Sequence, residues 1–142
     1  MFMQISSRFT IAVHILTCID YFAAEHTITS DFLAGSVGGN PVVIRQVIIQ
    51  LKAAGLVEVS RGKTGITLSR GLEDITLYDV YEAVESVKGK LFRFHDNPNP
   101  ECPVGRDIHA ALDGTLDEMQ EVLESNMKAV TLREIASRIG SV

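Results

Sequence analysis

The chain has 142 residues, a length that suits one domain with an appended element. Hydrophobic residues make up 46% and charged residues 22%, which excludes a disordered chain, and no run of about 18 apolar residues offers a membrane-spanning helix. The formal net charge of −5 by itself argues against a nucleic-acid partner.

The first ten residues lack the basic start, apolar run and small-residue cleavage site of a signal peptide. We therefore expect a cytoplasmic protein without a membrane partner. The two cysteines, Cys18 and Cys102, are too few for a disulfide framework, and a reducing cytosol would keep both as thiols.

Two helices are predicted before residue 40. Residues 8–24 carry apolar side chains at helical spacing nearly all round, which indicates a largely buried first helix. Thr29 has the side chain of an N-cap for a short second helix. Gly38 and Gly39 then end that helix, because glycine readily adopts the backbone geometry past a helix end.

A third helix is predicted from Asn40-Pro41 to Gly55, because asparagine is a favoured N-cap and proline is favoured in the first turn. Two helices joined by a tight glycine-containing turn are typical of a helix-turn-helix. Residues 40–70 hold five basic side chains against one acidic, a local net charge of +4 that suits a polyanion. A solvated basic face would carry the same charge, so charge alone does not decide.

A β-hairpin is predicted next, because residues 56–59 and 66–68 have strand character and the glycines between them allow a turn. The predicted tip is Arg61-Gly62-Lys63-Thr64-Gly65. A hairpin after a helix-turn-helix is a wing. The predicted fold class is therefore mainly α with a small β-hairpin, a winged helix-turn-helix followed by a long dimerisation helix.

The long helix is predicted from its apolar stripe. Thr76 and Asp79 have capping-box spacing for a helix to about Ser86, and turn formers make residues 88–105 an irregular loop. After this loop, apolar side chains recur at three- and four-residue steps over roughly 30 Å of helix. Packing on its own domain is possible, but a partner helix is the simplest cover for such a stripe. The predicted dimerisation residues are Ile108, Leu112, Leu116, Met119, Val122 and Leu123.

A short last helix is predicted from the capping-box spacing of Thr131 and Glu134. The predicted organisation is then a DNA-binding winged helix-turn-helix at 1–86, a connecting loop at 87–105, a dimerisation helix at 106–128 and a C-terminal helix at 129–142.

Several segments carry a resemblance that covers residues 6–137. They are Ser7-Arg8, Ala12-Val13, Thr29, Phe32-Leu33-Ala34, the run 51–57, Arg61-Gly62, Leu68-Ser69-Arg70, the run 75–80 and Ala83-Val84-Glu85. Together they resemble the Rrf2 family of regulators. The runs 40–45 and 101–105 look closest to a YwnA-like subgroup. The resemblance implies an operator of approximate two-fold symmetry and a C-terminal helix that packs back on the N-terminal domain.

The chain departs from this family in two places. Cluster-binding members carry three cysteines in the loop before the dimer helix, whereas here that loop holds only Cys102. Because clusters normally take several cysteine ligands, we expect no iron–sulphur cluster and no other cofactor. The second departure is a wing with fewer glycines, which affects its groove contacts.

The DNA-binding candidates follow from the helix-turn-helix, whose second helix meets base edges in the major groove. Arg45 could fork onto guanine and Gln46 onto adenine, while Val42 or Val43 could touch a thymine methyl or belong to the core. The resemblance adds Ser7 and Arg8, at the start of the first helix, as phosphate contacts. The cations at the predicted wing tip suit contact with phosphate or with a minor groove. The predicted residues are Ser7, Arg8, Asn40, Pro41, Val42, Val43, Arg45, Gln46, Arg61 and Lys63.

Cys102 is the candidate sensing residue, a loop thiol that is equally an ordinary surface cysteine. By residue type, His95, Cys102, Asp107 and His109 could hold zinc, but their spacing fits no standard motif, so no metal site is predicted. No nucleophile–base pair or phosphate-binding glycine loop indicates an enzyme.

The predicted function is a DNA-binding transcription regulator, a repressor acting as a homodimer on double-stranded DNA, with its effector unidentified. Two alternatives stay open: a redox or small-molecule sensor that uses the Cys102 loop, and a winged helix used only for protein contacts.

Overall fold

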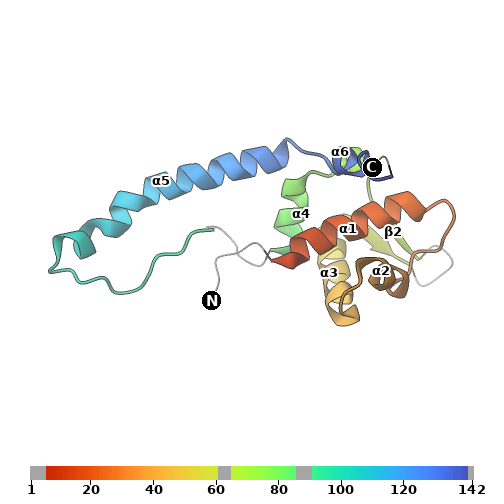
Figure 1. The fold of residues 1–142 in the computed structure, drawn as a ribbon, viewed down its shortest axis with the longest axis horizontal. Coiled ribbons are helices and arrows are strands. Elements are labelled where there is room, and N and C mark those ends of the chain that lie inside the picture. The colour runs from red at the N-terminus through yellow and green to blue at the C-terminus, as the bar shows by residue number, and fades with distance from the viewer. Residues whose placement is uncertain (1–5, 61–64, 86–90, 141–142) are drawn as a thin grey trace.

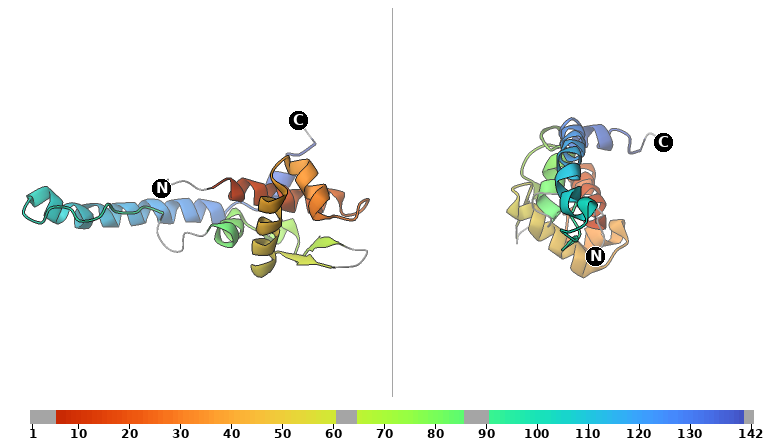
Figure 2. Two further views of the ribbon diagram at one scale, coloured as in Figure 1. Left: turned by 90° about the horizontal axis from the view of Figure 1, so that it is seen from below. Right: turned by 90° about the vertical axis from the view of Figure 1, so that its left-hand side faces the viewer.

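The computed structural model describes residues 6–60, 65–85 and 91–140. Figure 1 shows a cluster of short helices from which one long helix projects, and Figure 2 shows the same arrangement from two further sides. The elements in chain order are α1 (Ser7–Phe22), α2 (Ser30–Val37), α3 (Pro41–Ala53), β1 (Val57–Val59), β2 (Ile66–Leu68), η1 (Leu72–Asp74), α4 (Leu77–Val84), α5 (Pro103–Lys128) and α6 (Leu132–Ala136). Three helices followed by an antiparallel hairpin and a long helix confirm the predicted fold class.

The predicted N-caps of α2, α3 and α4 are confirmed. Thr29 accepts a hydrogen bond from the backbone N–H three residues on at 3.0 Å, and Asn40 accepts one from the N–H two residues on at 2.8 Å. Thr76 and Asp79 form the expected capping box. These bonds satisfy N–H groups that the first turn of a helix leaves unpaired. Gly38 ends α2 with a φ of 75°, a left-handed conformation that favours glycine.

The core lies between α1, α3, α4 and the hairpin, and α6 closes it from the C-terminal side. Leu132 of α6 is fully buried, and its backbone N–H donates to the carbonyl of Ile75 at 2.8 Å. The N–H of Leu77 donates to the carbonyl of Val130 at 2.9 Å, so two bonds tie the C-terminal segment to the start of α4. Other fully buried side chains are Ile15, Leu16, Ile19, Ile28, Leu33, Ile44, Val47, Leu51, Leu56, Leu72 and Ile75.

The hairpin is anchored to the segment that precedes α2. β1 and β2 pair antiparallel, with Val57 opposite Leu68. The backbone N–H of Ile66 also donates to the carbonyl of Ile28 at 2.9 Å. Gly65 has a φ of 64°, and a Cβ there would overlap the carbonyl oxygen of Ile28, so this close approach requires glycine. The predicted tip residues Arg61 and Lys63 lie outside the described residues.

The long helix α5 begins earlier than the sequence analysis predicted. We expected residue 106 as its start and a loop up to 105, but the helix begins at Pro103 and runs for 26 residues. Proline inside a helix breaks it, but proline in the first turn is favoured because its missing N–H costs nothing there. Pro103 therefore begins the helix instead of ending the loop. Smaller differences are that α1 ends at Phe22 and α4 at Val84, two residues before the predicted ends.

Residues 91–102 run back along α5, as Figures 1 and 2 show. The backbone N–H of Leu91 donates to Oε1 of Gln120 at 2.8 Å, which holds this segment against the helix. Within the described residues no single helix could cross a membrane. Counted together, α2 and α3 are long and apolar enough to do so, but this rests on length and composition alone, and the pair is bent by 116° at its junction.

Candidate nucleic-acid interface

α3 has one buried face and one exposed face. The buried face holds Ile44, Val47, Ile48 and Leu51, at the spacing of a core-facing helix. On the exposed face the side chain of Val42 is 50% and that of Ile49 is 65% accessible. Apolar and cationic groups share this face, and the major groove offers thymine methyls and guanine acceptors to match them. The exposed residues of α3 are Pro41, Val42, Arg45, Gln46, Ile49, Lys52 and Ala53.

Arg45 and Lys52 form the basic part of this face. Both side chains are exposed and form no ion pair with any residue in the described ranges. They line one wall of a hollow of about 530 Å³ between α3 and the hairpin, together with Ile49 and Val59. Arg70 instead lies 3.6 Å from the carboxylate of Asp79 at the start of α4. Of the described cations in residues 40–70, Arg45 and Lys52 therefore add positive charge to this face, whereas Arg70 is paired with Asp79.

Arg8 is held by two side chains of α3. Its guanidinium donates to Oε1 of Gln46 at 2.6 Å and to Oε1 of Gln50 at 3.2 Å. Arg8, which we predicted to contact a phosphate, thus uses part of its hydrogen-bonding capacity within the protein. Because its side-chain oxygen accepts from Arg8, Gln46 keeps its amide NH₂ group as a hydrogen-bond donor for a base edge.

Further bonds fix the start of α1 and the end of α4 around the same glutamines. The amide of Gln50 donates to the carbonyl of Val84 at 3.4 Å. The backbone N–H and the hydroxyl of Ser6 donate to one carboxylate oxygen of Glu85 at 3.1 and 3.2 Å. α1, α3 and α4 are therefore joined at one end by a polar network, and this network sets the orientation of Arg8.

The remaining predicted DNA contacts occupy different environments. Ser7 is exposed at the first position of α1, and Pro41 is exposed at the first position of α3. The side-chain oxygen of Asn40 is engaged in capping α3. Val43 is half-buried and packs against the core, which favours the core interpretation of this residue over contact with thymine.

The sequence analysis missed three residues of α3: Ile49 and Lys52 on the exposed face, and the half-buried Gln50 beside it. The signal for Ile49 was present, because the core spacing of Ile44, Val47, Ile48 and Leu51 leaves it on the outer side of the helix. Gln50 gave no such signal, since its partners Arg8 and Val84 lie 42 and 34 residues away in sequence.

The predicted dimerisation residues all lie on α5, which contacts the rest of the described chain mainly through α4. Met119 is 55% and Val122 is 62% exposed, and Leu112 is exposed as well. Ile108, Leu116 and Leu123 are half-buried. One face of α5 thus presents a row of apolar side chains that the described part of the chain leaves exposed or half-buried.

The predicted sensing residue Cys102 is exposed and stands at the N-cap of α5. Nearby, the rings of Phe94 and His109 stack with centroids 4.5 Å apart, and His95 meets His109 edge-on at 5.2 Å. Asp107 is paired with Arg106 at 2.9 Å. In the described ranges, no three His, Cys, Asp or Glu side chains are grouped so that they could hold a metal ion.

The comparisons with known proteins agree with this geometry. The family model Rrf2, described as an iron-dependent transcriptional regulator, matches residues 5–138. The chain is also similar to YwnA of Bacillus subtilis strain 168, named as a candidate HTH-type transcriptional regulator. The two are 37% identical over 136 residues, which cover 96% of this chain and 99% of YwnA.

Two solved structures resemble the fold closely. The first is the crystal structure of a protein described as a candidate DNA-binding protein, with a TM-score of 0.73 and 34% identity, covering 91% of this chain and 98% of that one. The second is IscR from T. potens, with a TM-score of 0.71, covering 97% of this chain and 89% of that one. At 20% identity the second likeness concerns the fold alone.

Proposed function

The chain belongs to the Rrf2 family of transcriptional regulators, and from this membership we propose that it is a homodimeric repressor whose operator has approximate two-fold symmetry. The observation that best supports this is the outer face of α3. There, Arg45 stands exposed and without an ion pair among the described residues, between the exposed aliphatic side chains of Val42 and Ile49. The aliphatic side chains cost little to desolvate against base edges, and Arg45 carries the positive charge that DNA attracts.

The proposed contacts divide into two kinds. Arg45 reads guanine with its planar fork of donors, Gln46 donates to a base acceptor, and Val42 contacts a thymine methyl. Phosphate contacts position the protein without carrying sequence information. We assign that role to Ser7, to Lys52 and to Arg61 and Lys63 of the predicted wing tip, and a smaller share to Arg8, because its guanidinium is already bonded to α3.

The proposed dimer forms through α5. Its 26 residues correspond to a rod of about 39 Å. The row of Leu112, Met119 and Val122 along this rod is solvent-exposed in a single chain. Burying it against the same row of a second copy removes apolar surface from water on both chains, and an isologous contact of this kind produces two-fold symmetry. Two recognition helices then face two half-sites.

An iron–sulphur cluster does not fit the donor set of this chain. There are two cysteines, and they lie apart in the fold: Cys18 is buried in α1, and Cys102 is exposed at the start of α5. Protein-bound clusters are normally held by several thiolates gathered at one place. The proposed function therefore includes no step through a cluster.

The experiment is selection of short duplexes from a random pool by the purified full-length protein, followed by anisotropy titration at two salt concentrations. We expect a two-fold-symmetric consensus, and log affinity should fall by about 0.9 for each phosphate contact per unit of log salt. Arg45→Ala should relax the consensus at one position of each half-site. Arg61→Ala and Lys63→Ala should weaken all sequences together and each reduce the salt slope by about 1.

Other outcomes would point to the two alternatives. Affinity no tighter than roughly 10 µM for every duplex at low salt would contradict DNA regulation and favour a winged helix used for protein contacts. A large change in operator affinity on thiol oxidation, abolished by Cys102→Ser, would favour a sensor built on the Cys102 loop. Repression itself is tested by transcription in vitro from a promoter that overlaps the selected site, where added protein should reduce transcript.

A further inference from the structure

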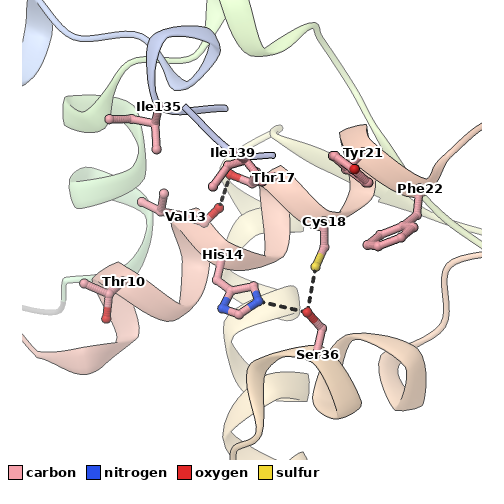
Figure 3. Close-up of a pocket in the computed structure, with 10 residues that line it drawn as sticks. All are labelled: Thr10, Val13, His14, Thr17, Cys18, Tyr21, Phe22, Ser36, Ile135 and Ile139. Carbon is pink, nitrogen blue, oxygen red and sulfur yellow. Dashed lines mark hydrogen bonds between the residues drawn. The ribbon is translucent and has the colours of Figure 1, made fainter. Parts of the chain in front are cut away.

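A groove crosses the outer side of α1. It lies on one side of α2, and the hollow between α3 and the hairpin lies on the other. It has a volume of about 530 Å³, inside the range of small-molecule sites in proteins. Figure 3 shows its two walls: Ser36 of α2 on one side, and Ile135 of α6 with Ile139 just beyond it on the other. α1 forms the floor. The groove thus joins the C-terminal helix to the first helix of the helix-turn-helix.

The groove is apolar over most of its wall and polar at one end. Val13 and Phe22 of α1 join the two isoleucines in the apolar part. At the α2 side, the thiol of Cys18 donates to Oγ of Ser36 at 3.1 Å, and Nε2 of His14 lies 2.9 Å from the same oxygen, as Figure 3 shows. Apolar walls with a few convergent polar groups are typical of ligand sites.

The polar end offers hydrogen-bond donors. If the hydroxyl of Ser36 donates to Nε2 of His14, the neutral ring carries its proton on Nδ1, and if Nε2 donates instead, the hydroxyl hydrogen of Ser36 is free; either way one donor remains. A protonated ring would carry a proton on Nδ1 as well. In the described part of the chain Nδ1 has no partner, and none of the described lining residues is an Asp or a Glu. A negatively charged oxygen would therefore meet a donor and no repelling carboxylate.

We propose that this groove binds a small molecule with an apolar body and one carboxylate, and that binding lowers the affinity for DNA. The carboxylate accepts the one hydrogen that the His14–Ser36 pair leaves free, and the apolar body lies against Ile135 and Ile139. The proposed effect of the ligand on DNA affinity rests on the proposed DNA-binding function. It gives the protein an effector site away from the Cys102 loop.

The route from the groove to DNA is short. Ser36 lies in the last turn of α2, which ends at Val37, and Asn40 is already the N-cap of α3. A ligand that takes over the bonds of Ser36 removes contacts that hold α2 on α1, and so shifts the start of the recognition helix. Coupling between sites is commonly a factor of about 5 or more in affinity.

The test uses full-length protein with isotopically labelled isoleucine and methionine methyl groups, titrated with 4-phenylbutyrate and, separately, with the neutral analogue 4-phenylbutan-1-ol. We expect saturable shifts of the Ile135 and Ile139 methyl signals, and binding of the acid roughly five-fold tighter than that of the alcohol. The Met119 methyl on α5 is the internal control for non-specific binding. His14→Leu should remove the preference for the acid, while the matched control His95→Leu should keep it.

Three results would overturn the proposal: no saturable shift at Ile135 and Ile139, an equal shift at Met119, or equal affinity for acid and alcohol. Dependence of the Ile139 signal on protein concentration would also overturn it, because a second copy would then cover the groove. The selected duplex is titrated in parallel, and its affinity should fall by about five-fold or more in saturating acid. Pocket binding without any DNA binding would contradict the proposed function, whereas DNA binding without pocket shifts would contradict only this inference.

Discussion

The guanidinium of Arg8 donates to Oε1 of Gln46 at 2.6 Å, although 38 residues separate them in sequence. This bond joins the first turn of α1 to the exposed face of the recognition helix. It also directs the amide of Gln46, since a carbonyl oxygen engaged by Arg8 leaves the NH₂ group to face a base. Arg8 is therefore a positioning residue for Gln46 as well as a candidate phosphate contact.

Replacing Arg8 tests this relationship. Arg8→Ala should lower the free energy of unfolding by about 1 kcal/mol, the usual net contribution of such hydrogen bonds. It should also free Oε1 of Gln46 to accept from adenine N6, so one operator position should shift towards adenine. The measurements are urea denaturation and repeated duplex selection. Arg45→Ala is the control: it should leave stability within about 0.5 kcal/mol and change a different position. An unchanged consensus with Arg8→Ala would show that Gln46 reads no base.

A charge placed on the exposed face of α5 tests the proposed dimer. Met119→Glu should convert the dimer to a monomer, because a carboxylate would be buried unpaired against the second copy. Sedimentation equilibrium measures the mass, and operator affinity should fall in parallel. Ala110→Glu inserts the same charge at an exposed position on the opposite side of the helix and should leave the dimer intact. A dimer that survives Met119→Glu would mean that another surface makes the contact.

The packing of α6 is tested at Leu132. Because its side chain is fully buried, Leu132→Ala should lower the free energy of unfolding by about 2–4 kcal/mol, through lost burial and a residual cavity. Ile139→Ala removes the same kind of side chain from an exposed position and should change stability by less than about 0.5 kcal/mol. Urea unfolding of both variants gives the comparison. Equal small effects would indicate that α6 is not docked in solution.

The hydrogen bond between Tyr78 and Glu82 of α4 predicts a pH dependence. The hydroxyl of Tyr78 donates to Glu82, and this hydrogen bond, with desolvation, raises the pKa of Tyr78 to about 12. The Nζ of Lys128 lies 4.6 Å from the Tyr78 ring centroid and links α5 to the same residue. Since the folded-state pKa lies above the unfolded value of 10.0, the stabilisation is fully present below pH 10. It is lost as the pH rises towards 12.

Tyrosinate absorbance measured against pH checks this expectation. Glu82→Gln should bring the pKa of Tyr78 down towards 10, because the charged acceptor and its repulsion of tyrosinate are both removed. Glu124 has a smaller effect on the same group, so Glu124→Gln should move the titration less. If the two variants titrated alike, the Tyr78–Glu82 bond would not be the main cause.

Much of the local structure follows from residues close together in sequence. The caps at Thr29, Asn40 and Thr76 were predictable because each bonds to an N–H two or three residues on. The start of α5 was not, because the prolines around it are equally typical of a loop and of a first helical turn. The apolar stripe of α5 was visible as a periodicity, although no sequence pattern could say which of its residues the chain itself covers.

The sequence alone determined the kind of molecule this is, since helix caps, turn glycines and apolar periodicity act within a few residues and together specify a helix-turn-helix with a hairpin. Only the tertiary structure decided the functional surfaces. It brought Arg8 to Gln46, turned Arg70 away from α3 towards Asp79, and formed the groove from α1, α2 and α6. The physical reason is that these contacts join residues tens of positions apart, whose meeting depends on how the whole core packs.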